Sequence, residues 1–388
     1  MSLTSQLAPG QPLHTWFAEK FPGTQRLAGS IAAAVRDVAP VRPAGRVDAR
    51  HWAAVGGAFG ARLALLTDAA PPYYALYGLV RAGLVSREWA DRTAATFPSH
   101  RGLDPERAAR GLEIRPTPTG WIDLAGPADG PSQTHHERVL SEFFARLVAY
   151  LDQHAPAGKL GTTGVETGLA RVCWLLAGWE SAYRSAELPV ELAELHRLPG
   201  YTVDDLRALP DEAVVAELVE LASRLRHHPR DPRDRPLELW NTWSRDHPGD
   251  RTVLQGGALG VSAPVLVHHW ADADLLIGSH LLDVKTVVRA DDPAKTSRWL
   301  WQLLAYAWLD TTDRYRIGVV GLYLARHGVH VSWGTTTFEQ ALLGSTRGVD
   351  QAHAEFVDLA SRVIAAEGAQ PPPPLASRRR LRDRIPWR

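Results

Sequence analysis

The hydrophobic pattern divides the chain into a long helical part and a shorter strand-rich part. Up to about residue 225, large apolar residues recur at the spacing of amphipathic helices. Pro- and Gly-rich connections interrupt this pattern over the first 130 or so residues. We expect helices over residues 51–67, 73–84, 136–153, 165–188 and 204–225.

After Gly256 the pattern changes to short runs rich in β-branched residues, each bounded by turn residues. Their order predicts three strands, one helix over residues 296–309 and two further strands. We therefore expect one compact α/β unit embedded in a larger helical protein. The expected strands lie within residues 263–270, 271–278, 281–288, 316–325 and 329–334.

A Pro- and Gly-rich stretch at residues 111–132 marks a boundary between parts of the chain. It predicts a helical N-terminal region at 1–130 and a second domain at 131–345, with a helical insertion before its core strands. Residues 346–388 would form a C-terminal helix and a Pro- and Arg-rich tail, which is either a nucleic-acid arm or a solubilising end. The charged run at 227–236 is typical of a solvated loop.

Composition narrows the class of protein without naming a function. The 388 residues include 43 Lys+Arg and 43 Asp+Glu, so any nucleic-acid contact would need a local basic groove rather than an overall positive charge. The single cysteine, Cys173, excludes an intramolecular disulfide. The sequence shows no secretory signal and no apolar run of about 18 residues, so we expect a cytoplasmic protein without a membrane span.

Chemistry-bearing residues gather in the sequence ADADLLIGSHLLDVKTVV, which predicts a β-hairpin with its turn at residues 278–280. Alternation along a strand places Asp283 and Lys285 on one face and Val284 on the other. Asp274 would lie opposite them across the hairpin. Two carboxylates and one ammonium group would then meet at one end of the sheet.

Such a cluster suits phosphodiester hydrolysis. Mg²⁺ or Mn²⁺ would be held by Asp274, Asp283 and the carbonyl of Val284, and would polarise a phosphate and acidify a bound water. Lys285 would position that water or stabilise developing charge. The alternative is an ion pair on an exposed edge strand, which the apolar residues around the hairpin disfavour. Asp272 shares the strand parity of Asp274, so facing alone does not choose between them.

The helix expected at 296–309 carries two polar side chains, Gln302 and Tyr306, in an otherwise apolar sequence. They stand four residues apart and therefore one above the other on the same helical face. They belong either to the same site or to helix packing with satisfied hydrogen bonds.

Together these residues resemble the RecB-like branch of the PD-(D/E)XK nuclease superfamily. The resemblance covers residues 263–334 and rests on an Asp before a hairpin, an Asp-X-Lys-Thr strand and a Gln-X-X-X-Tyr helix. It implies a restriction-endonuclease-like core, a mixed sheet flanked by helices. By resemblance Asp274 and Asp283 bind Mg²⁺ or Mn²⁺, Lys285 assists hydrolysis, and Gln302 and Tyr306 order the site and the DNA.

The chain departs from that family at the upstream ligands. Many RecB-like members carry a Gly-X-X-X-His helix, but Gly60 stands where the histidine would fall. A glutamate on the helix before the hairpin is the replacement we consider, either Glu166 or Glu180. Glu166 is preferred because Thr167 and Gly168 would allow close approach, although either glutamate can equally be an ordinary surface residue.

The resemblance predicts a nuclease acting on DNA rather than RNA, in DNA repair or in defence against foreign DNA such as that of viruses. The N-terminal helical region would bind substrate or a partner protein. Two alternatives stay open. One is a catalytically inactive nuclease-fold module that binds nucleic acid or a partner protein; the missing histidine and the neutral net charge favour it. The other is a helical partner-binding protein in which the strand region is incidental.

Overall fold

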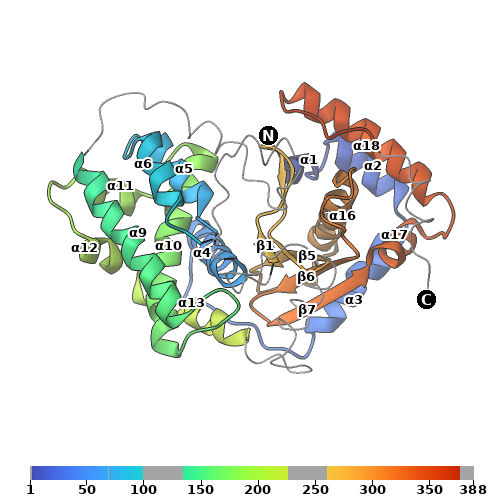
Figure 1. The fold of residues 1–388 in the computed structure, drawn as a ribbon. Helices are drawn as coiled ribbons and strands as arrows, with labels where there is room; N and C mark the ends of the chain where they lie inside the picture. Colours follow the sequence, from blue (N-terminus) through green and yellow to red (C-terminus); the bar gives the residue numbers. More distant parts are fainter. Residues whose placement is uncertain (1, 69, 99–133, 226–259, 376–388) are drawn as a thin grey trace, which may run out of the picture.

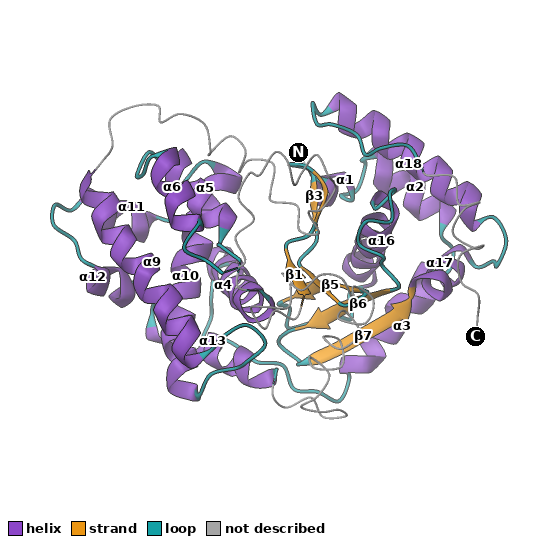
Figure 2. Cartoon of the chain, in the orientation of Figure 1, coloured by secondary structure: helices purple, strands orange, loops and turns teal. Residues whose placement is uncertain are grey.

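The computed structural model describes residues 2–68, 70–98, 134–225 and 260–375. The boundary at 111–132, the charged run at 227–236 and the basic part of the tail lie outside these ranges. The described chain is a mixed α/β fold in which a central sheet separates two groups of helices (Figures 1 and 2). No helix in the described ranges is both long and apolar enough to cross a membrane.

The elements keep chain order from α1 to α18. The helices are α1 (Leu3–Gln6), α2 (Pro12–Lys20), α3 (Thr24–Val35), α4 (Ala49–Thr67), α5 (Tyr73–Arg81), α6 (Arg87–Ala94), α9 (Thr134–His154), α10 (Thr163–Ser185), α11 (Val190–Arg197), α12 (Val203–Ala208), α13 (Glu212–Arg224), α16 (Pro293–Leu309), α17 (Thr335–Leu343) and α18 (Val349–Ala366). The strands are β1 (Gly260–Ser262), β2 (Val265–Val267), β3 (Ala271–Asp272), β4 (Leu275–Ile277), β5 (His280–Lys285), β6 (Val319–Leu324) and β7 (Val329–Gly334).

The expected helices are present, with three differences that local chemistry explains. Helix α5 ends at Arg81 rather than at 84, close to Gly83, whose φ is 69°. Helix α10 ends at Ser185 rather than at 188, because Ala186 adopts the left-handed conformation with a φ of 65°. The prediction of one helix over 204–225 is wrong, since α12 and α13 are separate. Pro210 lies between them and has no N–H to donate, and Asp211 begins the new helix by accepting a hydrogen bond from the N–H of Ala213 at 2.6 Å.

The main sheet has the strand order β1-β4-β5-β6-β7. All neighbouring strands are antiparallel except β5 and β6, which are parallel and connected through α16. Strands β2 and β3 form a separate two-stranded sheet. The single strand expected at 271–278 is therefore divided into β3 and β4, and β1 was not predicted.

The two faces of the sheet belong to two different hydrophobic cores. Leu275 and Leu282 point into the core formed with α4 and α10, whereas Leu276 and Leu281 point into the core formed with α16 and α3. This follows from the two-residue period of a strand. Both faces of the hairpin are therefore covered by helices.

The N-terminal part of the chain contributes to both cores. Phe17 and Ile31 pack in the core around α16, while Phe59 and Leu76 pack in the core around α10. The cores thus define a sheet lobe with α1–α3 and a helical lobe with α4–α13. The predicted division at about residue 130 concerns the order of segments along the chain and not the core in which each segment packs. It therefore stays a prediction.

A buried arginine joins the two lobes. Arg326 is fully buried in the β6–β7 turn and forms an ion pair with Glu217 on α13. Its Nε donates to the Thr286 carbonyl at 3.0 Å, and its Nη1 donates to the Val41 carbonyl at 3.0 Å. The guanidinium also lies 4.6 Å from the ring centroid of Trp52 on α4. One side chain therefore connects α4 and α13 to the end of β5.

Replacement of Glu217 by alanine should leave the buried Arg326 charge without its carboxylate. Loss of one partner of a buried pair costs about 3–5 kcal/mol, so we expect a decrease of this size in the free energy of unfolding measured with urea. The matched control is Glu88→Ala, which removes the exposed Arg92–Glu88 pair and should change the value by less than about 1 kcal/mol. Equal small effects from both variants would contradict a joining role for Arg326.

Candidate metal site at the end of the β4–β5 hairpin

The hairpin register places the two candidate carboxylates opposite each other. Leu275 pairs with Leu282 and Ile277 with His280, so the next position along the hairpin sets Asp274 against Asp283. Gly278, the first of the two turn residues, has a φ of 59°, which glycine adopts without steric penalty. The predicted hairpin is thus confirmed, but its turn is Gly278-Ser279 rather than residues 278–280, because His280 already pairs with Ile277 as the first residue of β5.

Asp274 lies just before β4, and its carboxylate takes the place of a backbone carbonyl as a hydrogen-bond acceptor. Its Oδ2 accepts a hydrogen bond from the N–H of Val284 at 2.6 Å, where the ladder between the strands ends. Solvent reaches the side chain through a pocket, but the walls of both lobes surround it. The loss of surrounding water and the nearby Asp283 charge raise the pKa of Asp274 to about 7.

Asp283 and Lys285 form an ion pair on the face of β5 that packs against α16. Asp283 is only 2% exposed, and the Lys285 Nζ lies 2.5 Å from its Oδ2. Because Val284 lies between them and faces the helical lobe, the two charged side chains share one face, as the strand period predicts. The buried carboxylate therefore has a cation immediately beside it.

Helix α16 holds the lysine from the other side. The Lys285 Nζ donates to the Gln302 Oε1 at 3.1 Å, and the Gln302 Nε2 donates to the Tyr306 hydroxyl at 2.7 Å. An ammonium group can only donate, so the amide oxygen must face it and the orientation of Gln302 is determined. The Gln302 Nε2 also lies 3.4 Å from the Thr4 Oγ1 of α1, a contact that spacing in the sequence did not indicate. Burial raises the pKa of Tyr306 well above its ordinary value, so its hydroxyl stays protonated.

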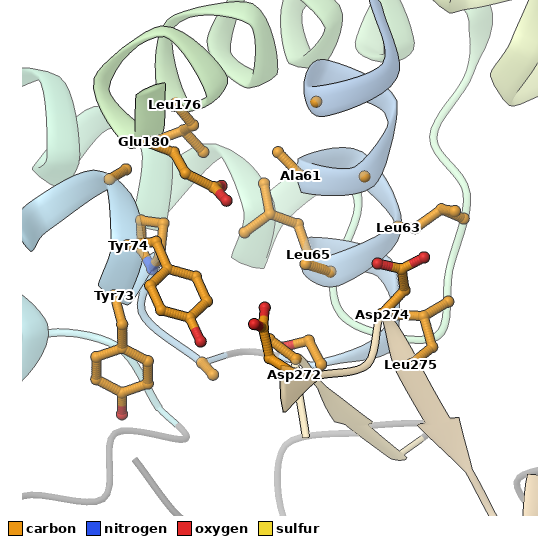
Figure 3. A pocket seen from close by; sticks show the side chains of 18 of the residues that line it. Ala61, Leu63, Leu65, Tyr73, Tyr74, Leu176, Glu180, Asp272, Asp274 and Leu275 are labelled. Carbon is orange, nitrogen blue, oxygen red and sulfur yellow. The ribbon is translucent and has the colours of Figure 1, made fainter. Parts of the chain in front are cut away.

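A pocket of about 350 Å³ opens beside Asp274, between the helical lobe and the ends of β1, β3 and β4. Figure 3 shows Asp272 and Asp274 on its strand side, with Glu180 and Tyr74 facing them from the helices. Its volume lies in the range of small-ligand sites, and most of its lining side chains are apolar. Of the candidate ligands, Asp274 and Val284 line this pocket, whereas the buried Asp283 lies behind them and does not.

The structure does not bring Glu166 to this pocket. Both oxygens of Glu166 accept hydrogen bonds from the buried Arg62, at 2.7 and 2.9 Å, and one also accepts from the N–H of Gly161. Glu180 lines the pocket instead. The two glutamates stand 14 residues apart on α10, which is about 21 Å along a helix axis. Geometry thus favours Glu180, and the role of Glu166 is to pair with Arg62.

Asp272 and Glu180 share one cation on the pocket wall. The Arg184 Nη2 lies 2.6 Å from the Glu180 Oε1 and 3.5 Å from the Asp272 Oδ2. Half of the Arg184 side chain is exposed, so these pairs can exchange partners at little cost. Continuation of the β4–β5 register by one residue beyond Leu275 places Asp274, and not Asp272, opposite Asp283. The structure therefore favours Asp274 as the first ligand.

The donor set suits a hard divalent cation. Mg²⁺ and Mn²⁺ prefer oxygen ligands, and Mg²⁺ commonly uses one or two carboxylates and keeps several waters. Asp274, Asp283 and the Val284 carbonyl can supply such oxygens. Within the described ranges, no three His, Cys, Asp or Glu side chains form a ready metal cluster. Glu180 is paired with Arg184.

Small residues bring α4 close to the hairpin. Gly56, Gly57 and Gly60 all line the pocket. A methyl group at position 56 would lie 2.9 Å from the Thr286 Oγ1, whereas one at position 60 would meet nothing within 4 Å. Gly60, which stands at the place of the family histidine, therefore contributes open space and no ligand.

The chain matches no protein-family model, no curated protein and no solved structure. The interpretation of the site therefore depends on its residues, their contacts and the chemistry that these permit.

The raised pKa of Asp274 predicts a pH-dependent stability of the metal-free protein. Its folded-state value of about 7 exceeds the ordinary 3.8, so the folded chain holds a proton that the unfolded chain releases between these values. Its contribution to stability is complete below about pH 4 and is lost as the pH rises through about 7. Asp274→Asn, which cannot ionise, should leave Tm little changed in acid and raise it above neutral pH. A Tm difference that does not vary with pH would contradict this account.

Proposed function

We propose that this protein is a Mg²⁺- or Mn²⁺-dependent nuclease that hydrolyses phosphodiester bonds in DNA, with Asp274, Asp283 and Lys285 at its active centre. One observation carries the proposal. The hairpin sets two carboxylates against each other, and Lys285 lies between one of them and the amide of Gln302. A structural ion pair needs one carboxylate and one cation, so the second carboxylate at an accessible pocket is what points to a metal.

The fold around the hairpin supports a restriction-endonuclease-like core. The antiparallel hairpin β4–β5 continues through α16 into β6, which is parallel to β5, and helices pack on both faces of the sheet. This is the mixed sheet flanked by helices that the resemblance to RecB-like nucleases implies. The candidate residues lie at the end of the shared hairpin and on the helix that follows it.

Each side chain has a separate task in this proposal. A bound Mg²⁺ or Mn²⁺ would polarise the scissile phosphate and lower the pKa of a coordinated water. Asp274 and Asp283 hold the ion, and the Lys285 ammonium group stabilises the negative charge that grows on the phosphate oxygens during attack. Lys285 is a donor with three protons, so it can contact a phosphate oxygen while it keeps Gln302 as a partner.

Gln302 and Tyr306 act on the lysine and not on the phosphate. The buried Tyr306 hydroxyl fixes the Gln302 amide, and the amide oxygen fixes the Lys285 ammonium group. A flexible lysine side chain is thereby held near one geometry before substrate arrives, which reduces the ordering needed during the reaction. We therefore assign Gln302 and Tyr306 as positioning residues.

The resemblance extends the proposal to DNA repair or defence against foreign DNA in the cytoplasm. The pocket beside Asp274 can accommodate a nucleotide-sized group of the substrate. A partner protein that binds the N-terminal helical region remains part of the proposal. The alternative is a nuclease-fold module that binds nucleic acid or a partner protein without cutting. The pairing of Glu180 with Arg184 favours this alternative, because the arginine already balances the glutamate charge without a metal ion.

Cleavage of linear and circular DNA in Mg²⁺ or Mn²⁺ tests the proposal. Lys285→Ala should lower kcat by about 10²–10³-fold, because it removes charge stabilisation in the transition state. Asp283→Asn should lower it at least as much. The control is Lys159→Ala, which changes a lysine on the loop between α9 and α10. Cutting by wild type that survives both active-centre substitutions would contradict the assignment, and no cutting by folded wild type would favour the binding module.

Titration of the metal-free protein with Mn²⁺ distinguishes Glu180 from Glu166 as the upstream metal ligand. Asp274→Asn and Asp283→Asn should each weaken binding by at least about tenfold, and Glu180→Gln should weaken it about tenfold by removing a carboxylate near the ion. Glu166→Gln should leave the Mn²⁺ affinity unchanged while it lowers Tm, because Arg62 loses its charged partner. The reverse result for the two glutamates would restore Glu166 as the upstream ligand.

A further inference from the structure

Hydrogen bonds to the buried Arg326 connect the segment 36–50 to the end of β5, beside the candidate active centre. The N–H of Val41 donates to the Arg326 carbonyl at 2.8 Å, and the Arg326 guanidinium returns a bond to the Val41 carbonyl at 3.0 Å. The same guanidinium binds the carbonyl of Thr286, the residue after Lys285. Only the buried Arg326 therefore separates this segment from the end of β5.

The segment is basic and exposed. Its acidic residues are Asp37 and Asp48, and Asp48 is occupied in capping α4, where it accepts a hydrogen bond from the N–H of His51 at 3.0 Å. None of its arginines forms an ion pair with another residue in the described part of the chain. The exposed arginines are Arg36, Arg42, Arg46 and Arg50.

Arg50 lies close to the end of β5. It stands six residues before Gly56 on the same run of chain, and Gly56 packs beside Thr286. Six residues of helix span about 9 Å, and phosphates follow one another along a DNA strand at about 3.4 Å of axial rise. Arg50 therefore lies within a few phosphate spacings of Thr286, the residue after Lys285.

Charge along α4 gives the site a direction. The charged residues that line the pocket near the C-terminal half of α4 are Asp68, Asp272, Asp274, Glu180 and Arg184. The opposite end carries the arginines of the segment 36–50. Arg42 lies near the β6–β7 turn, where burial, then the charges of Arg224 and Arg326 and last that of Arg42 lower the pKa of His327. A polyanion leaving the active centre is repelled by the pocket and attracted by the segment.

We propose that residues 36–50 bind the sugar–phosphate backbone that flanks the scissile phosphate, through Arg42, Arg46 and Arg50. This proposal deepens the nuclease function above and rests on it for the identity of the ligand. The contacts are to phosphates, so they add affinity and fix the direction of the strand without selecting a base sequence. The substrate strand extends from Lys285 toward the start of α4.

The test compares two triple variants with the same change in charge. One is Arg42→Gln, Arg46→Gln and Arg50→Gln. The control is Arg138→Gln, Arg197→Gln and Arg347→Gln, which changes exposed arginines on α9, on α11 and before α18. Fluorescence anisotropy of a labelled DNA duplex, with Ca²⁺ in place of Mg²⁺, is measured over a range of salt concentrations so that binding is observed separately from cutting.

We expect the first variant to bind at least about tenfold more weakly and to lose about 2–3 from the slope of log K against log salt, while the control keeps both values. Equal affinity and slope in wild type and both variants would overturn the proposed surface, even if wild type cuts DNA. A selective loss of binding in the first variant supports the surface, even if wild type fails to cut and the nuclease function is abandoned. No binding of DNA by folded wild type would overturn the surface itself.

Discussion

A buried carboxylate needs a cation beside it, and Asp283 imposes this requirement at the centre of the molecule. Lys285 satisfies it on the same strand face, and Gln302 and Tyr306 then hold the lysine from α16. Asp274 brings a second carboxylate opposite the first, and one cation no longer balances both. Burial and then the nearby Asp283 charge raise the pKa of Asp274 in the metal-free chain, and a divalent cation would oppose both effects.

The sheet places this cluster at the junction of two lobes. One face of the hairpin belongs to the core of each lobe. Arg326 joins the two lobes, because it binds Glu217 in the helical lobe and the Thr286 carbonyl at the end of β5. His51, on α4, binds the second Glu217 oxygen at 2.8 Å and extends the same network. The end of β5, beside the candidate metal site, and the contact between the lobes thus belong to one network of hydrogen bonds and ion pairs.

The features of the fold and of the candidate site that could be predicted from the sequence are those that depend on residues close together along the chain. Strand alternation placed Asp274, Asp283 and Lys285 correctly within the hairpin, and helical spacing placed Gln302 above Tyr306. Contacts between distant segments left no such periodic signal. The Arg326–Glu217 pair spans 109 residues, and Thr4 reaches Gln302 across 298. The preference for Glu166 rested on the small residues that follow it. Such residues also occur beside a buried glutamate that pairs with an arginine, as Glu166 does. The pocket position of Glu180 depends on the packing of α10 against α4 and α5, which the sequence does not show.

The central claim is that Asp274 and Asp283 together hold a divalent cation beside Lys285. Crystals of the protein soaked in Mn²⁺ and measured for anomalous scattering test it most directly, because the ion is located without any assumption about substrate. The account predicts one anomalous peak in contact with both carboxylates and the Val284 carbonyl, at about 2.0–2.2 Å as for other small divalent cations on oxygen ligands. Well-ordered carboxylates with no peak between them, or a peak only elsewhere in the molecule, would contradict it.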